Sequence, residues 1–157
     1  MEDSIFKKME RAGKLREQKA GIVQVEELLK DAISDLNEAK KTSGVSDKAT
    51  YIMAYTAMLK AGRALLLLYG YRPDDGAQHK TVIEVTGAVI GEEYKNLTMQ
   101  FEVMRRKRNE MMYGSGSIFS KTDSDKAFLD AISLVKRILK TVKSKNPQLE
   151  LEFDIKG

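Results

Sequence analysis

The chain has 157 residues, of which 42% are hydrophobic, and this size and composition suit one folded domain. It contains no cysteine, which excludes disulfide bonds, thiolate metal sites and cysteine nucleophiles. Lys and Arg total 27 against 23 Asp and Glu, and the resulting net charge of +4 is too small to identify a partner by itself.

The first half of the chain predicts two long helices behind an N-terminal segment. Residues 1–20 are highly charged and predict an arm or a short helix. Apolar residues then recur at spacings of three and four from Ile22 to Lys41, which is one stripe of an amphipathic helix. Ser46 or Asp47 is expected to cap the next helix. Its broad apolar face makes that helix the central one, with a stripe formed by Tyr51, Tyr55, Met58, Gly62, Leu65 and Tyr69.

The second half predicts two further helices and a tail. Residues 71–79 predict a loop because they include Pro73 and Gly76, and residues 81–90 fit either a strand or the short helix that we favour. A helix is expected over 94–113, followed by a flexible loop over 114–117. Thr122 with Asp125 resembles a capping box for the last helix. Residues 147–157 alternate apolar and acidic, and this tail could pair across a dimer, pack as an extended arm or be disordered.

Together these elements predict an all-α fold, an antiparallel four- to five-helix bundle over residues 21–146 with a short C-terminal extended tail. Neither a run of about 18 apolar residues nor an apolar signal segment is present. We therefore expect a cytoplasmic protein that does not associate with a membrane.

The helix end around Arg108 holds the candidate functional residues. Arg108 occupies a position of the apolar stripe, where arginine is rare unless its charge is paired. At about 100° per residue, an arc of about 140° contains Arg105, Arg108, Asn109, Met112 and Tyr113. Two guanidinium groups on one face suit two-pronged binding of a phosphate. Alternatively, the basic run is a solvated helix end with no such role.

The segment Arg108-Asn-Glu-Met-Met-Tyr113 resembles the signature of HEPN domains, in which an Arg precedes a His by four to six intervening residues. Residues 55–73, with their Gly-Tyr-Arg-Pro turn, are similar to the long helix of small prokaryotic HEPN proteins, in which a His-containing segment like residues 78–83 follows. The resemblance covers roughly residues 49–113. It implies a dimeric bundle whose facing Arg and His residues cleave RNA without a metal. It also implies a toxin-like partnership with a small nucleotidyltransferase, although other members only bind.

Tyr113 stands where the family has its histidine. Tyrosine titrates near 10 and histidine near neutral pH, so this replacement predicts weak or absent nuclease activity. The phenol can still hydrogen-bond or stack on a base. His79, the single histidine, could act as an acid or base, or it could make only a local hydrogen bond. Arg63 is a further binding candidate, although it could instead pair with an acidic side chain.

Three hypotheses follow from these residues. The first is a HEPN-like dimer that binds RNA or a nucleotide phosphate at Arg108, Asn109 and Tyr113, with Arg105 as a second contact. The second is a metal-independent endoribonuclease that uses Arg108 with Tyr113 or His79. The third is a structural module whose apolar groove receives a partner helix. We expect no metal site and no cofactor.

Overall fold

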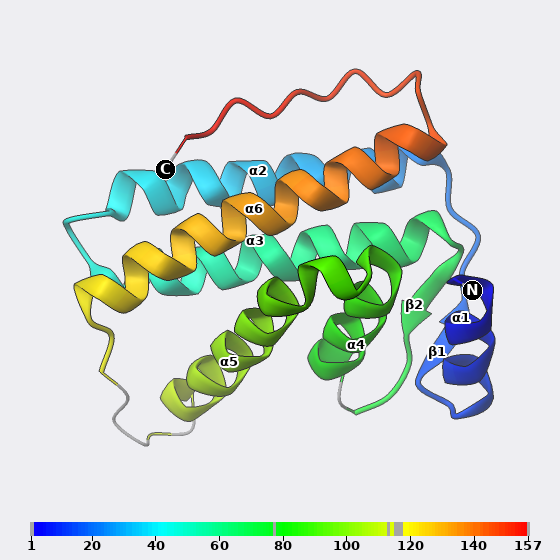
Figure 1. The fold of residues 1–157 in the computed structure, drawn as a ribbon, viewed down its shortest axis with the longest axis horizontal. Helices are drawn as coiled ribbons and strands as arrows, with labels where there is room; N and C mark the ends of the chain where they lie inside the picture. The colour runs from blue at the N-terminus through cyan, green and yellow to red at the C-terminus, as the bar shows by residue number, and fades with distance from the viewer. Residues whose placement is uncertain (1, 77, 113, 115–117, 157) are drawn as a thin grey trace.

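The computed structural model describes residues 2–76, 78–112, 114 and 118–156. Within these residues the chain forms six α-helices, one 3₁₀ turn and two short strands (Figure 1). In chain order they are α1 (Glu2–Arg11), β1 (Leu15–Glu17), α2 (Ile22–Thr42), α3 (Asp47–Leu68), β2 (Tyr71–Pro73), α4 (Gln78–Ile90), η1 (Glu92–Tyr94), α5 (Lys95–Met112) and α6 (Lys121–Lys145). The all-α bundle is confirmed, with six helices where four or five were predicted.

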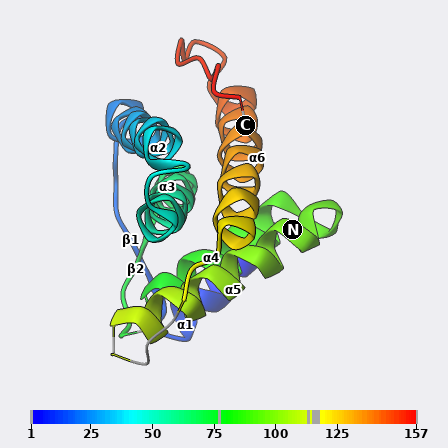
Figure 2. The ribbon, with the colours of Figure 1, turned by 90° about the vertical axis from the view of Figure 1, so that its left-hand side faces the viewer.

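Helix α3 is the centre of the molecule, as its broad apolar face predicts. It packs against α2, α4, α5 and α6. Helices α2, α3 and α6 follow the long axis, while α4 and α5 lie across one side of α3 (Figures 1 and 2). Among the described helices, α3 alone is long and apolar enough to cross a bilayer, but 61% of that apolar window is buried in the bundle. Its apolar character is therefore accounted for by the core.

The helix ends show which capping predictions hold. Ser46 is the N-cap of α3, because its hydroxyl accepts a hydrogen bond from the Ala49 N–H at 3.1 Å. For α6 the predicted capping box was wrong. Ser120 caps that helix by accepting from the Asp123 N–H at 3.0 Å, so the helix begins before Thr122. The same polar-x-x-acidic spacing occurs two residues earlier than the pair that the pattern suggested.

The loop predicted over residues 71–79 contains β2 and the start of α4. Strand β2 pairs antiparallel with β1, with Arg16 opposite Arg72. The N-terminal segment thus forms α1 and β1, and Phe6 of α1 stacks on the rings of Tyr69 and Tyr71 at centroid distances of 4.7 and 5.0 Å. The pairing of β1 with β2 joins residues far apart in the chain, so no local sequence pattern predicted it.

A close approach at Gly62 places α4 against α3. A Cβ atom added at Gly62 would lie 2.6 Å from Val82 Cγ1 and 2.9 Å from Thr86 Oγ1. At such distances a side chain at position 62 would force Val82 and Thr86 to shift. The prediction that Gly62 admits a neighbouring helix is confirmed, as is the helical interpretation of residues 81–90.

The C-terminal tail packs as an extended arm, one of the three predicted alternatives. Residues 149–156 form neither helix nor strand, yet Leu149 and Ile155 are each only 7% exposed. Lys156 lines a cavity together with Lys40 of α2 and Phe128 of α6. The tail therefore returns along the α2–α6 side of the bundle (Figure 1).

Candidate functional site

A cleft of about 380 Å³ lies where the first turn of α4 meets the end of α5. It contains four residues that the sequence singled out, namely His79, Arg105, Arg108 and Asn109. The remaining lining residues are Asp75, Gly76, Gln78 and Lys80. Tyr113 lies outside the described residues, and Arg63 lines a neighbouring cavity instead.

Helix α5 supplies the arginines of the cleft from the edge of its buried face. Phe101 and Met104 on that face are fully buried, and the half-buried Arg108 continues the stripe one turn further. The apolar stripe therefore ends at the cleft, and Arg108 stands at the boundary between core and solvent. This position continues the apolar stripe as predicted, and it fits both a phosphate contact and an arginine whose stem lies on the core while its charge meets solvent.

The two arginines differ in their partners. Arg105 donates two hydrogen bonds to the Glu102 carboxylate, from Nε at 2.6 Å and from Nη2 at 2.9 Å. These bonds hold the pKa of Glu102 below its ordinary value and raise that of Arg105. Arg108 has no ion pair within the described part of the chain. Arg105 is thus held in place, while the guanidinium of Arg108 is available to a ligand.

His79 is oriented by a buried tyrosine of α3. The Tyr55 hydroxyl lies 2.9 Å from His79 Nδ1, and Tyr55 is only 1% exposed. Burial raises the pKa of Tyr55 to about 12, against the opposing effect of Arg108 and Arg105, so its phenol stays protonated at neutral pH. A hydrogen bond at one ring nitrogen fixes the orientation of the imidazole and leaves Nε2 as the other functional nitrogen.

The surroundings of His79 favour its neutral form. Burial lowers the pKa of His79, and the positive charges of Arg63, Arg108 and Arg105 lower it further. The imidazole is therefore uncharged at neutral pH and able to accept a proton. A bound anion would oppose the effect of the arginines and favour protonation.

The first turn of α4 adds groups that sequence reasoning missed. The exposed Lys80 and Gln78 line the cleft on either side of His79. Thr81 donates to the Asp75 carboxylate at 3.0–3.2 Å, which fixes the turn before the helix. The first backbone N–H groups of a helix lack intrahelical partners and favour anions. The sequence signal was available, since a basic residue adjoins the single histidine at a helix start.

Tyr55 was also missed as a site residue. The sequence placed it on the apolar stripe of the central helix, and its burial agrees with that position. Its hydroxyl reaches His79 across 24 positions of sequence. No spacing rule connects the two residues, so this contact emerges only when α4 packs on α3.

The arrangement can hold an anion and move a proton. Three cationic side chains, Lys80, Arg105 and Arg108, face one acidic residue, Asp75. Guanidinium groups bind phosphate oxygens in a two-pronged geometry. No cluster of three His, Asp or Glu residues suited to a metal ion occurs among the residues that the structure describes.

Comparison with known proteins bears on this site. The model of the HEPN domain family matches residues 25–145, which include α4 and α5 and hence all the residues of the cleft. The family is associated with ribonuclease and nucleotide-binding roles. Neither a curated protein nor a solved structure matched the sequence. The match spans most of the 157 residues, and the chain belongs to the HEPN domain family.

Proposed function

We propose that this protein binds RNA or a nucleotide phosphate in the cleft between α4 and α5. The observation that carries the proposal is the half-buried Arg108, which has no ion pair among the described residues, beside an oriented, neutral His79. Arginine at such a position is costly without a negative partner. A phosphate supplies that partner, and its oxygens match the guanidinium fork.

Each cleft residue takes a role that its chemistry allows. Arg108 contacts the phosphate directly, and Arg105 adds a second contact through the N–H groups that Glu102 leaves free. The Asn109 amide is suited to a ribose hydroxyl or a base edge. Tyr113 holds the position of the family's histidine in the sequence, and its phenol could supply a hydrogen bond or a stacking surface for a base.

The binding role is tested by one substitution and a matched control. Arg108→Ala removes the unpaired guanidinium, whereas Arg106→Ala removes an equal charge from the same helix outside the cleft. A charged hydrogen bond contributes about 1.5–3 kcal/mol, so Arg108→Ala should weaken binding of a labelled oligouridylate at least tenfold. Fluorescence anisotropy measures the affinity. The proposal is wrong if folded Arg108→Ala and Arg106→Ala proteins both bind the oligouridylate as tightly as the parent protein does.

Cleavage of RNA is the second candidate function, and the Tyr55–His79 hydrogen bond favours it. Neutral His79 would take the proton of a ribose 2′-hydroxyl as that oxygen attacks the adjacent phosphorus. The bond to the 5′-oxygen would then break, and solvent would protonate the leaving oxygen. We expect slow cleavage, because Tyr113 replaces the histidine of the family signature.

Incubation of labelled RNA with the protein in a chelator tests this candidate. Cleavage that disappears in His79→Ala or in Tyr113→Phe supports a ribonuclease. A rate that neither substitution changes points to a contaminating enzyme. Binding without cleavage in the parent protein leaves the first proposal standing alone.

We also propose a homodimer that uses the groove between α4 and α5. The groove has a volume of about 500 Å³. Met99 and Val103, one turn apart on its rim, are 57% and 52% exposed. Exposed apolar residues that adjoin one another are typical of protein interfaces. Lys80 lines both the groove and the cleft, so a second copy seated on the groove would border the phosphate site.

A nucleotidyltransferase partner is proposed from the family alone. Pull-down of the tagged protein from its own cells tests it against the structural-module hypothesis. Recovery of a small nucleotidyltransferase supports the pair. A retained protein of another class, with no RNA, would favour a module whose groove receives a partner helix.

A further inference from the structure

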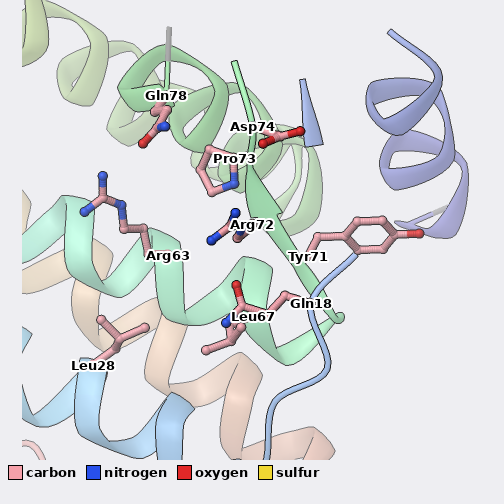
Figure 3. A pocket seen from close by; sticks show the side chains of 9 residues that line it. All are labelled: Gln18, Leu28, Arg63, Leu67, Tyr71, Arg72, Pro73, Asp74 and Gln78. Atoms are coloured by element: carbon pink, nitrogen blue, oxygen red, sulfur yellow. The ribbon is translucent and has the colours of Figure 1, made fainter. Parts of the chain in front are cut away.

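A second cavity, of about 310 Å³, adjoins the cleft. Gln78, the first residue of α4, lines both of them. Figure 3 shows Arg63 extending from α3 towards Gln78, with Arg72 of β2 beside it. The two cavities thus form neighbouring sites around the start of α4.

The two arginines of this cavity have no negative partner among the described residues. Arg72 Nε is buried, and no hydrogen-bond partner for it occurs in that part of the chain. Neither Arg63 nor Arg72 has an ion pair anywhere in the described ranges. Asp74, the acidic residue on the rim, lies 3.9 Å from Arg16 instead. A buried charged donor without a partner is costly, and this arrangement calls for an anionic ligand.

Separate elements of the fold place these two arginines in one cavity. Arg63 comes from the central helix, and Arg72 is fixed by the pairing of β2 with β1. Leu28 of α2 and Leu67 of α3 provide an apolar wall. Charges beside an apolar wall interact more strongly with a ligand than charges in open water. The positive charge of Arg63 also contributes to the lowered pKa of His79, which places it within electrostatic reach of the first cleft.

We propose that Arg63 and Arg72 form a second phosphate-binding site, which takes the phosphate adjacent to the one at Arg108 on the same single-stranded RNA. This inference rests on the proposed function of the first cleft and extends it. Gln78 stands between the two phosphates, with an amide suited to the intervening sugar. A row of separate cationic contacts that follows the backbone is how proteins hold single strands.

The test compares ligands that differ in their number of phosphates. Uridylyl-uridine has one phosphodiester, hexauridylate has five, and uridine 5′-monophosphate represents the free nucleotide. The protein variants are Arg63→Gln, Arg72→Gln and Arg108→Ala, with Lys136→Gln/Lys140→Gln on the exposed side of α6 as a charge control. The resonance of the single histidine reports weak binding in the cleft, and anisotropy reports tight binding.

The expected result is a difference between the two oligonucleotides. Arg63→Gln and Arg72→Gln should each weaken hexauridylate binding about tenfold and change uridylyl-uridine binding less than twofold. Loss of one phosphate contact should also reduce the slope of log affinity against log salt by about 0.7. The lysine control should leave the relative affinities unchanged. Arg63→Gln leaves β2 intact, so it tests the site even if Arg72→Gln fails to fold.

Other outcomes overturn the inference in distinguishable ways. Unchanged hexauridylate affinity in folded Arg63→Gln and Arg72→Gln, with Arg108→Ala defective, removes the second site and keeps the first. An Arg108→Ala protein that binds every ligand normally refutes the proposed function itself. If binding of uridine 5′-monophosphate depends on Arg63 but not on Arg108, the second cavity does bind phosphate. It is then a separate nucleotide site, and the inference that both sites hold one RNA strand is wrong.

Discussion

Phosphate binding and protonation of His79 should be thermodynamically coupled. In the free protein, burial and the charges of Arg63, Arg108 and Arg105 lower the pKa of His79. A phosphodiester at Arg108 brings a negative charge into the same cleft, and it should raise the pKa of His79. Linkage requires the reciprocal effect, so protonation of His79 must tighten phosphate binding by the same factor.

The size of this effect follows from the shared cleft. Arg108 and His79 line one space of about 380 Å³, so a phosphate held by Arg108 would share that space with the imidazole. An opposite charge within about 4–6 Å of an imidazole favours its protonated form by about 1.4 kcal/mol or more. The affinity for hexauridylate should therefore rise as the pH falls below neutrality, and the gain should reach about tenfold once the pH lies below the lowered pKa of His79 in the free protein. Phosphodiesters stay ionised throughout, so the ligand does not contribute to this change.

The single histidine makes the measurement direct. Its ring C–H signal can be followed by NMR against pH with and without hexauridylate, and no other imidazole overlaps it. His79→Gln keeps a group that can hydrogen-bond Tyr55, and it should bind with an affinity that does not depend on pH. Identical His79 titrations with and without ligand, together with a flat affinity in the parent protein, would refute the coupling.

Three further predictions concern the scaffold and the interface. Gly62→Ala gains helix propensity but forces close contacts with Val82 and Thr86. It should lower the free energy of unfolding by about 1–2 kcal/mol and the midpoint of thermal denaturation by about 2–8 °C. An unchanged midpoint would show that α4 can shift away from α3 at no cost in stability. Met99→Glu/Val103→Glu should convert a dimer to a monomer in sedimentation experiments without a loss of helical circular dichroism, and an unaltered sedimentation coefficient contradicts the proposed interface. Ile155→Ala should lower stability by about 2 kcal/mol in urea denaturation because Ile155 is buried, while Lys156→Ala serves as the exposed control and should have no effect.

Local periodicity was enough to predict the long helices. The stripe from Ile22 to Lys41 and the broad apolar face of the next helix both follow from a spacing of 3.6 residues per turn. This spacing can be recognised within one segment of the sequence, without knowledge of its tertiary contacts. The pairing of Leu15 with Pro73 could not be predicted in this way. Two three-residue strands carry almost no pattern, and only the docking of α1 brings them together.

In the candidate site too, residues that share one helix were predictable from the sequence, and contacts between different elements were not. Arg105, Arg108 and Asn109 share a helix, so a helical angle of about 100° per residue already placed them on one face. Their meeting with His79 depends on the packing of α4, which Gly62 permits. Arg72 belongs to the Gly-Tyr-Arg-Pro turn of the family resemblance, but nothing in its sequence context predicted that it lines a cavity, because an arginine in a turn is ordinarily solvated.

The position of His79 bears on whether the replacement of the signature histidine by Tyr113 excludes catalysis. The replacement of the signature histidine by Tyr113 argues against proton transfer by the residue at that position. The structure offers an imidazole on α4 instead, oriented by Tyr55 and neutral among arginines. A neutral base beside an anion-binding group is what cleavage at the 2′-hydroxyl needs. If the cleft only binds, His79→Gln should cost little affinity at alkaline pH, where the parent imidazole carries no charge. If the cleft cuts, the same substitution should abolish the reaction while binding persists, so the choice between the two functions depends on one side chain.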